Sequence, residues 1–380
     1  MTGGAATGTA GLERELPHAM AAGLTASGAL SSRRWVSAFE AVPRHVFVPR
    51  IFLDLDGTGS YELLDGCDPG RRREWLEQVY ADEPLVIELD GDAWVSSSSQ
   101  PSLMAMMLEA LTVTGSERVL EVGTGTGYNA ALLCAGLGSE QVVSVDIDAG
   151  LVDTARARLR GLGYVPVLAA ADGAGGYPGA APYDRIIATC SMPRIPLGWL
   201  AQTAPGGLIM ANLYRELGGG ALALLAAAGD RASGHFLPFS GGFMPTRTVS
   251  RATGTDLLGR RRGGGARRPA AIDAGVLDDD AFGMFAALRL PGIQRLGLLP
   301  AGEPEQAWLL GHDGSWACQA GPGGLVTQGG PVRLWDLLEA IYRDWTALGC
   351  PPRAELGLTV TADGSHLLWH SAPDGPAWTL

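Results

Sequence analysis

The chain of 380 residues contains no lysine, so all 28 of its basic residues are arginines. Together with 55 glycines, this bias reflects genome composition more than a physical demand of the fold. Acidic residues number 40, which leaves a formal net charge of −12. This balance disfavours a nucleic-acid partner, because binding to phosphates needs a basic face.

Sequence signatures of metal and disulfide chemistry are also missing. The five cysteines are scattered without a C-x-x-C pair, which indicates neither a disulfide framework nor a zinc site. The six histidines are dispersed as well, and no H-E-x-x-H motif occurs. We therefore expect no metal centre in this protein.

No segment has the properties of a membrane anchor or a secretion signal. The longest wholly apolar run, Ala221 to Ala228, is far too short to span a bilayer. Residues 1 to 11 are small and uncharged, lack an apolar signal core, and are predicted to form a disordered tail. The sequence therefore predicts a cytoplasmic protein, and its 46% hydrophobic content is ample for the cores of two or more domains.

The most informative stretch covers residues 116 to 148, where a βαβ unit is predicted. Its elements are a strand over Val119–Val122, a helix over Asn129–Leu137 and a strand over Val142–Ile147. Three glycines, Gly123, Gly125 and Gly127, lie between the first strand and the helix, where a backbone can approach a ligand closely. We expect a side chain at these positions to push the ligand away from the helix N-terminus.

Two ligands compete for this glycine turn. A dinucleotide fingerprint, G-x-G-x-x-G, needs a glycine where this chain has Tyr128. Glu121 stands two residues ahead of the first glycine, where it would repel a pyrophosphate but suit a ligand that carries an ammonium and a sulfonium. Asp146 ends the second strand about 20 residues further on, where an acid can bridge ribose hydroxyls. The inferred cofactor is S-adenosylmethionine, with S-adenosylhomocysteine as its product; a plain tight turn is the alternative, and Tyr128 can equally be a packing residue.

Four consecutive serines precede a predicted helix over Ser102–Leu111. Pro101 suits the first helical position, because its missing N–H falls where the helix offers no partner. One serine can cap this helix, but four offer more hydroxyls than a cap uses, beside a helix end that favours anions. The helix interior is apolar nearly all round, which predicts burial.

Strands and helices continue to alternate up to about residue 245. The further predicted elements are helices over Leu151–Leu162 and Pro196–Gln202 and strands over Val165–Ala169, Tyr183–Cys190 and Ala221–Ala228. This alternation predicts an α/β domain with a doubly wound sheet over residues 12 to 245. Asp172 follows the third strand on the side where ligands bind in such sheets, which predicts a contact with adenine or substrate.

Three other segments depart from this regular pattern. Residues 50 to 78 look irregular and form an insertion. Residues 246 to 270 are predicted to be an arginine/glycine linker, with a mobile arm that gathers an acidic peptide as the alternative. Residues 271 to 380 are predicted to be a smaller α+β domain, in which short strands flank one amphipathic helix, Val332–Leu348, without a catalytic motif.

An ordered series of short motifs runs through the first 245 residues. They are Val42-Pro-Arg-His-Val-Phe-Val-Pro, Tyr80-Ala-Asp-Glu-Pro-Leu, Ser99-Gln-Pro, Met106-Met-Leu-Glu-Ala-Leu, Glu121-Val-Gly-Thr-Gly-Thr-Gly-Tyr, Asp172-Gly, Ala181-Pro-Tyr-Asp-Arg-Ile-Ile-Ala-Thr and Gly206-Gly. This series resembles protein-L-isoaspartate O-methyltransferases. The resemblance implies a Rossmann-like class I methyltransferase sheet, and it puts Ser99 where the family has its active-site serine.

Some features resemble a peptide-tailoring branch of that family, which accompanies lanthipeptide and ATP-grasp (graspetide) clusters. The family's usual Thr-Ile-Ser reads Ser97-Ser98-Ser99 here, and a C-terminal domain is added. The distal stretches Gly330-Pro-Val-Arg-Leu-Trp and Gly357-Leu-Thr-Val-Thr also resemble this branch. The resemblance implies methylation of an L-aspartate side chain in a precursor or macrocyclised peptide, after which the next backbone nitrogen attacks the ester to give an aspartimide.

The predicted chemistry depends on positioning more than on acid–base catalysis. An aspartate carboxyl group has a pKa of about 3.9, so the nucleophile is already ionised at neutral pH. Alignment of donor and acceptor can supply roughly 7 to 11 kcal/mol. The predicted catalytic residues, which orient the carboxylate, are Ser98 and Ser99, and the predicted cofactor-binding residues are Glu121, Gly123, Gly125, Gly127, Asp146 and Asp172.

Three rival functions are compatible with parts of this pattern. A repair enzyme would methylate isoaspartate in damaged proteins, and a small-molecule O-methyltransferase would use the same cofactor. A nucleic-acid amino-methyltransferase would need Asn/Asp-Pro-Pro-aromatic after the fourth strand, where this chain has Thr189-Cys190-Ser191. The preferred partner is therefore a peptide, recognised by the C-terminal domain, with no nucleic acid and no membrane.

Overall fold

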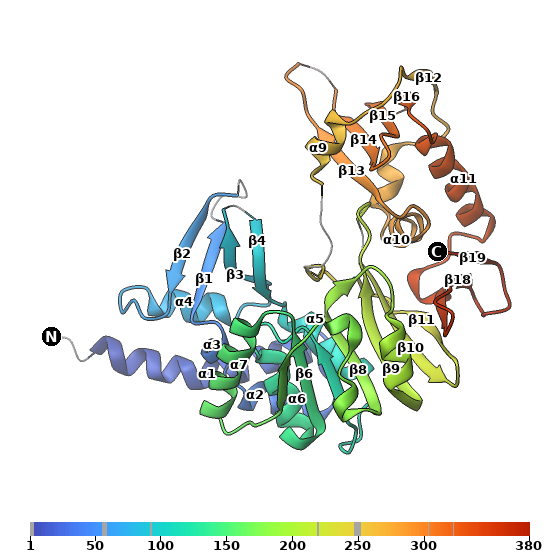
Figure 1. Cartoon of the computed structure of the whole chain (residues 1–380). Coiled ribbons are helices and arrows are strands. Elements are labelled where there is room, and N and C mark those ends of the chain that lie inside the picture. The colour runs from blue at the N-terminus through green and yellow to red at the C-terminus, as the bar shows by residue number, and fades with distance from the viewer. Residues whose placement is uncertain are drawn as a thin grey trace. The chain divides into compact units, whose positions relative to one another are not determined.

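A computed structural model describes residues 4–54, 59–91, 93–218, 220–246, 252–302, 304–321 and 323–380 (Figure 1). The chain divides into two compact units. The first comprises Met1–Cys190 and Pro196–Met210, and the second comprises Ser191–Ile195 and Ala211–Leu380. Two strands, β8 (Tyr183–Met192) and β9 (Thr203–Leu213), begin in the first unit and end in the second.

Parallel strands form the centre of the first unit in the order β8-β5-β6-β7. Their bounds are β5 (Val119–Val122), β6 (Val142–Asp146) and β7 (Val167–Ala170), and the helices between them are α6 (Tyr128–Leu137), α7 (Ala149–Gly161) and α8 (Leu197–Gln202). All four residues of β5 are buried, as expected for a parallel strand covered on both faces. Strand order reverses between β5 and β8, and this switch point is where such sheets bind ligands. The predicted doubly wound α/β sheet is confirmed.

Helices from the N-terminal region complete the first unit. They are α1 (Gly4–Ala26), α2 (Arg33–Ala41), α3 (Arg44–Phe47) and α5 (Pro101–Ala110). Residues 1 to 11 were predicted to form a disordered tail, but α1 already begins at Gly4. Alanine is the strongest helix former, and alanines 5, 6 and 10 extend the helical pattern that follows them. Residues 1 to 3 lie outside the described part of the chain.

The insertion predicted to be irregular, residues 50 to 78, is largely regular. It contains β1 (Arg50–Asp54), β2 (Tyr61–Asp65) and α4 (Arg72–Val79), and residues 55 to 58 lie outside the described ranges. With β3 (Leu85–Asp90) and β4 (Ala93–Ser98), the strands form an antiparallel sheet in the order β2-β1-β3-β4. The prediction was wrong because long-range contacts stabilise these elements: the buried Trp75 indole donates to the Val48 carbonyl oxygen at 3.1 Å.

Antiparallel strands β10, β11, β17, β18 and β19 lie next to one another in that order in the second unit. Their bounds are Ala221–Ala228, Arg231–Phe236, Leu356–Thr361, His366–His370 and Ala377–Thr379. Arg231 pairs with Thr361 across β11 and β17, so residues 130 positions apart in sequence (361 − 231) are direct neighbours. The second unit therefore starts well before residue 246, where the domain boundary was predicted.

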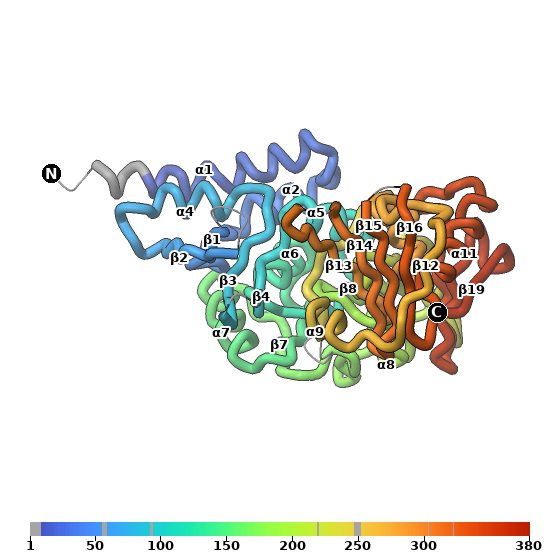
Figure 2. The backbone as a smooth tube through the Cα atoms, turned by 90° about the horizontal axis from the view of Figure 1, so that it is seen from above, coloured from blue at the N-terminus to red at the C-terminus, as the bar shows by residue number. Residues whose placement is uncertain are grey.

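A five-stranded antiparallel sheet forms the rest of the second unit, in the order β12-β16-β15-β14-β13, and its strands lie side by side in Figure 2. The strands are β12 (Ala266–Pro269), β13 (Ile293–Leu298), β14 (Gln306–Gly311), β15 (Trp316–Ala320) and β16 (Leu325–Gly329). The helices are α9 (Gly254–Gly259), α10 (Asp280–Arg289) and α11 (Leu334–Ala347). Short 3-10 helices are η4 (Ala274–Asp278) and η5 (Arg353–Glu355) in this unit and η1 (Ser139–Gln141), η2 (Gly173–Gly175) and η3 (Pro178–Ala180) in the first unit.

Two predictions for this region differ from the structure. Residues 246 to 270 were predicted to be a linker, but they contain α9 and β12; residues 247 to 251 lie outside the described ranges. A capping box between Thr253 and Asp256 begins α9, which is a local signal that the arginine/glycine composition concealed. The amphipathic helix predicted over Val332–Leu348 is confirmed as α11, but α10 was missed because it is apolar nearly all round.

Gly127 provides a test of the turn that starts α6. Its φ is 90°, and a Cβ built there would lie 3.0 Å from Ala155 Cβ on α7. We expect Gly127→Ala to lower the free energy of unfolding by about 1–3 kcal/mol, because alanine disfavours this conformation and the two methyl groups collide. Urea denaturation measures the change.

The matched control is Gly23→Ala on α1, where an added Cβ meets nothing within 4 Å. This variant should be more stable than the wild type by about 0.5–1 kcal/mol, since alanine is the better helix former. If the two variants were equally stable, the packing argument for Gly127 would be wrong.

Candidate active site

The glycine turn lies at the carboxyl end of β5. Gly123, Gly125 and Gly127 all have positive φ, at 101°, 51° and 90°. A Cβ at Gly123 would meet Thr189 Oγ1 at 2.8 Å, whereas a Cβ at Gly125 would meet nothing within 4 Å. Only Gly125 therefore faces open space that a ligand can use. A side chain at Gly123 or Gly127 would instead collide with other residues of the protein. The predicted reason was a collision with the ligand.

Asp146, at the end of β6, is fixed against this turn. Its Oδ2 accepts a hydrogen bond from the Gly125 amide at 2.9 Å, and its Oδ1 accepts one from the Asp148 amide at 3.1 Å. The side chain is partly exposed, and each carboxylate oxygen can still accept a further hydrogen bond. This arrangement suits the bridging of two ribose hydroxyls.

Ile147 follows Asp146 and was missed as a candidate, because it was assigned to the strand. The strand ends at Asp146, and 48% of Ile147 is exposed. A flat ring such as adenine could pack against this exposed, branched apolar side chain. The signal in the sequence is an apolar residue directly after the acid that ends a buried strand.

Glu121 lies underneath the turn, not at its surface. Its Oε1 accepts from Asn129 Nδ2 at 2.7 Å, and its Oε2 accepts from Ser144 Oγ at 2.5 Å. Ser144 Oγ also lies 2.6 Å from Thr124 Oγ1, which belongs to the turn itself. Glu121 is 0% exposed, and burial raises the pKa of its carboxyl group to about 7. In this structure the residue therefore connects β5, β6 and α6 beneath the turn, and its predicted role in cofactor binding stays a prediction.

Asp172 is exposed after β7, and its Oδ1 accepts from the Ala174 amide at 3.0 Å at the start of η2. The next residue, Gly173, packs against Val122, since a Cβ built on it would lie 2.3 Å from Val122 Cγ1. Val122 is the last residue of β5, directly before Gly123. Asp172 thus lies at the same edge of the sheet as the glycine turn, as the sequence predicted.

The serine run leads from β4 into α5, and it does not cap that helix. The N-cap residue of α5 is Gln100, without a side-chain cap bond, and Asp82 Oδ1 accepts from the Ser102 amide at 2.8 Å. Ser98 is buried and Ser99 is partly buried. Because Asp82 does the capping, the capping alternative for the serines loses its support.

Arg44, which begins α3, holds the serine run in place. Its guanidinium donates to Ser98 Oγ at 3.4 Å and to the Ser99 carbonyl oxygen at 3.0 Å. It also donates to the carbonyl oxygens of Val79, Ala81 and Glu83 at 2.8, 3.1 and 3.3 Å. The side chain is 0% exposed, and this burial lowers its pKa to about 10.

The same guanidinium reaches the glycine turn. Arg44 Cζ lies 5.9 Å from the ring centroid of Tyr128, which directly follows Gly127. Tyr128 is buried and its ring packs against Phe39 and Phe47, so the packing role considered for it is what the structure shows. Arg44 was not assigned a role from the sequence. The sequence signal for such a role is an arginine among apolar residues in the motif Val42-Pro-Arg-His-Val-Phe-Val-Pro.

The described residues offer no other arrangement of this kind. No group of three His, Cys, Asp or Glu side chains among them is placed to hold a metal ion, and their cysteines are free thiols. Within the same ranges, no helix is long and apolar enough to cross a membrane.

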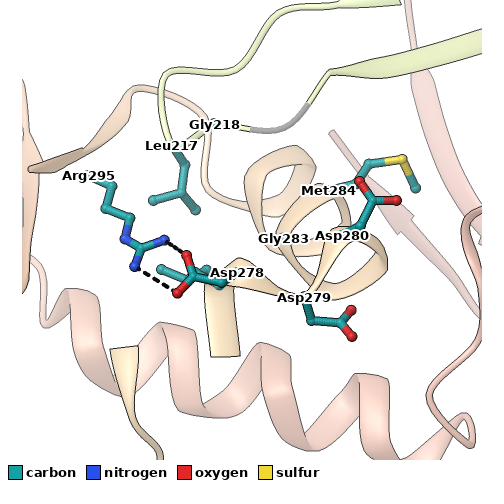
Figure 3. A pocket seen from close by; sticks show the side chains of 9 residues that line it. Leu217, Gly218, Asp278, Asp279, Asp280, Gly283, Met284 and Arg295 are labelled. Carbon is teal, nitrogen blue, oxygen red and sulfur yellow. Dashed lines mark hydrogen bonds and ion pairs between the residues drawn. The ribbon is translucent and has the colours of Figure 1, made fainter. Parts of the chain in front are cut away.

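A cavity of about 250 Å³ lies within the second unit (Figure 3). It is lined by Leu217, Gly218, Leu277, Asp278, Asp279, Asp280, Gly283, Met284 and Arg295. Its three carboxylates already have partners: Asp278 pairs with Arg295, Asp280 pairs with the buried Arg353, and Asp279 accepts from the Phe282 amide. Because each of these carboxylates already has a partner, we take the arrangement in the first unit as the candidate active site.

The pKa of Glu121 predicts a pH-dependent stability. Because the folded-state pKa (about 7) exceeds the reference value of 4.5, the folded protein binds this proton more tightly than the unfolded chain. Stability from this group is fully present below about pH 4.5 and is lost as the pH rises to about 7, a change on the order of 3 kcal/mol. Glu121→Gln should lose this dependence, since the amide can accept from Asn129 and donate to Ser144.

Urea denaturation of the wild type and of Glu121→Gln at about pH 5 and about pH 8 measures this difference. Glu15→Gln on the exposed face of α1 is the control and should retain the wild-type pH dependence. If the free energy of unfolding changed equally between the two pH values in the wild type and in Glu121→Gln, Glu121 would not titrate in this range.

Similar sequences identify the family of the first part of the chain. A family described as Protein-L-isoaspartate(D-aspartate) O-methyltransferase (PCMT) matches residues 71–217. A protein-L-isoaspartate O-methyltransferase of Anaeromyxobacter dehalogenans (strain 2CP-C) is 48% identical over 134 residues, which are 35% of this chain and 61% of that protein. One of Ignicoccus hospitalis is 34% identical over 198 residues, or 51% of this chain and 80% of the relative. The chain thus spans about three-fifths of the Anaeromyxobacter relative and four-fifths of the Ignicoccus relative.

A solved structure agrees with the fold of both units. A protein-L-isoaspartate O-methyltransferase superposes with a TM-score of 0.55 at 22% identity, covering 94% of this chain and 100% of the other. The fold is therefore that of class I methyltransferases, and the C-terminal region has a counterpart in a protein of that name. An added C-terminal domain thus does not set this chain apart. From the matched relatives and the site described above, we conclude that the chain belongs to the protein-L-isoaspartate O-methyltransferase family.

Proposed function

We propose that this protein is an S-adenosylmethionine-dependent carboxyl O-methyltransferase that acts on a protein or peptide. The observation that carries the proposal is the position of Arg44, which bonds the serine run and lies against Tyr128 at the end of the glycine turn. One buried cation thus connects the segment proposed to hold the acceptor with the segment proposed to hold the methyl donor. Family membership supports the same reaction class.

The residues at the edge of the sheet fit the cofactor. Open space at Gly125 leaves room for a ligand against the backbone, and the partly exposed Asp146 carboxylate can accept from ribose hydroxyls. Gly123, Gly127 and the buried Glu121 shape the turn, and Asp172 lies beside it. S-adenosylmethionine supplies an activated methyl group on a sulfonium, and S-adenosylhomocysteine is what leaves.

The serines fit the orientation of an anionic acceptor. A side-chain carboxyl group is ionised at neutral pH, so it needs alignment and not a general base. Ser98 is buried and bonds Arg44, whereas Ser99 is more exposed and is held through its carbonyl oxygen. Ser99 is therefore the residue that we propose to contact the carboxylate, with Ser98 and Arg44 positioning it.

Isoaspartyl residues in proteins are the acceptor that we favour. The relatives that match this chain are named for that substrate, and the C-terminal region has a structural counterpart in a solved structure of the same name. After methyl transfer, the following backbone nitrogen can attack the ester carbonyl. The new N–C bond forms as the C–O bond to the methoxy group breaks, and methanol leaves with the amide proton.

A second acceptor is an ordinary L-aspartyl residue in a precursor or graspetide-like peptide. The observation that favours it is the run Ser97-Ser98-Ser99, which replaces the usual Thr-Ile-Ser of the repair enzymes. The same ester and ring-closure chemistry would then give an aspartimide as the product of a tailoring pathway, with the second unit recognising the peptide.

Ser99→Ala tests the site. We expect kcat to fall about 100-fold, because a small misplacement of the acceptor is enough for such a loss, while S-adenosylmethionine affinity is unchanged. Methyl transfer from labelled cofactor and calorimetric titration measure the two quantities. Ser116→Ala, at an exposed position of the same unit, is the control. Equal losses of cofactor affinity and kcat would assign Ser99 a structural role.

Two peptides that differ only in L-isoaspartate against L-aspartate identify the acceptor. We expect kcat/KM for the isoaspartyl peptide to be about 100-fold higher, a discrimination that one well-placed polar contact can supply. The reverse preference would favour the precursor-peptide function. Methylation of neither, by protein that binds the cofactor, would contradict both acceptors.

A further inference from the structure

The segment around β12 concentrates positive charge on an acidic protein. Residues 252 to 270 contain five arginines and one carboxylate, while the whole chain has a net charge of −12. Arg268 pairs with Asp336 and Glu339 of α11. The other four, Arg260, Arg261, Arg262 and Arg267, are exposed, and none has an ion pair within the described residues.

Carboxylates near these four arginines are engaged elsewhere. Asp256 accepts from the Thr253 amide at 3.0 Å, within the capping box of α9. Asp313 accepts from the amide and the hydroxyl of Ser315, both at 2.9 Å. Asp256 interacts electrostatically with Arg260 and Asp313 with Arg262, but neither forms an ion pair within the described residues, and the four arginines outnumber these two carboxylates.

The strand register places Arg267 on one face of the five-stranded sheet. Arg267 of β12 pairs with Thr327, which pairs with Cys318, which pairs with Trp308. Directly paired residues share a face, so this row crosses the sheet on one side. Arg268, the next residue along, points to the other face, where it meets α11. The arginine face, defined by this row and by α9, is thus distinct from the face that α11 covers.

The arginine face is only partly covered by the unit. The six-residue helix α9 places Leu257 against Trp308, Leu310 and Trp316. The Arg261 guanidinium lies 4.7 Å from the ring centroid of Trp308 and 5.6 Å from that of Trp316, which holds one cation over the aromatic pair. Leu325, beside this row on β16, is 41% exposed. Exposed cations therefore stand next to exposed apolar surface.

We propose that the arginine face docks an acidic, extended segment of the methyl-acceptor protein or peptide, whose carboxylates meet Arg260, Arg261, Arg262 and Arg267. The inference rests on the proposed function for the identity of the partner. Charge complementarity selects an acidic partner, and the exposed Leu325 beside Arg267 favours a peptide with apolar side chains over a bare polyanion. A nucleic acid carries charge of the same sign, and an oligothymidylate is therefore one of the probes of the test.

Fluorescence anisotropy with a labelled peptide of alternating glutamate, leucine, aspartate and glycine tests the docking. The full chain should bind this peptide, and added salt should weaken the binding because exposed charges are screened. The double variant Arg260→Gln/Arg267→Gln should weaken it about 3- to 20-fold, since each exposed charge pair contributes modestly. Circular dichroism should show an unchanged fold, because both side chains are exposed.

Matched probes and one control variant make the result decisive. Arg343→Gln removes an exposed arginine from α11, on the helix that covers the opposite face, and should bind the peptide as the wild type does. The same peptide with glutamine and asparagine should bind more weakly. Equal binding by the double variant, or tighter binding of an oligothymidylate of equal charge, would overturn the proposal.

Methylation kinetics separate this inference from the proposed function. In the double variant, KM for an acidic acceptor peptide should rise by the same factor as its Kd, while kcat and cofactor affinity stay unchanged. An unchanged KM would overturn the arginine face and leave the reaction standing. Peptide binding that depends on the arginines, without methylation of any carboxyl group, would support the arginine face and contradict the reaction.

Discussion

The arrangement of the candidate active site depends on one buried cation. Arg44 is fully enclosed, and the two terminal nitrogens of its guanidinium donate to four carbonyl oxygens and the Ser98 hydroxyl, with no carboxylate among these acceptors. Taking a charge out of water is costly, so such a group persists only where several dipoles converge on it. The convergence fixes three chain segments together: the turn after α4, the serine run and the start of α3.

The glycine turn shows how a ligand edge is built from backbone conformation. Three positive φ angles bring the chain around from β5 to α6, and Asp146 fixes the middle glycine through its amide. The buried Glu121 supports this from below by accepting from α6 and β6. Ionisation of this buried carboxyl group lowers the free energy of unfolding. The loss of stability follows from the buried position in which Glu121 supports the turn.

The second unit adds surface without adding catalytic groups. Its cavity holds acids that are already paired, whereas the four exposed cations of the arginine face have no ion-pair partner among the described residues. In a family defined by chemistry at aspartyl carboxylates, substrate selection has to come from groups outside the reacting atoms. A cationic face on an otherwise acidic protein meets that requirement for a partner of opposite charge.

The sequence by itself determined the doubly wound sheet, because strand and helix periods and the glycine turn are local patterns. It also placed Asp146 and Asp172 at the carboxyl edge of the sheet, since each lies at or just after the end of a parallel strand. Only the tertiary structure decided that Glu121 lies beneath the turn, because burial depends on Asn129 and Ser144 from other elements. The same holds for Arg44, for the strands within residues 50 to 78 and for the pairing of β11 with β17: each depends on partners far away in the chain, and local sequence patterns carry no information about such partners.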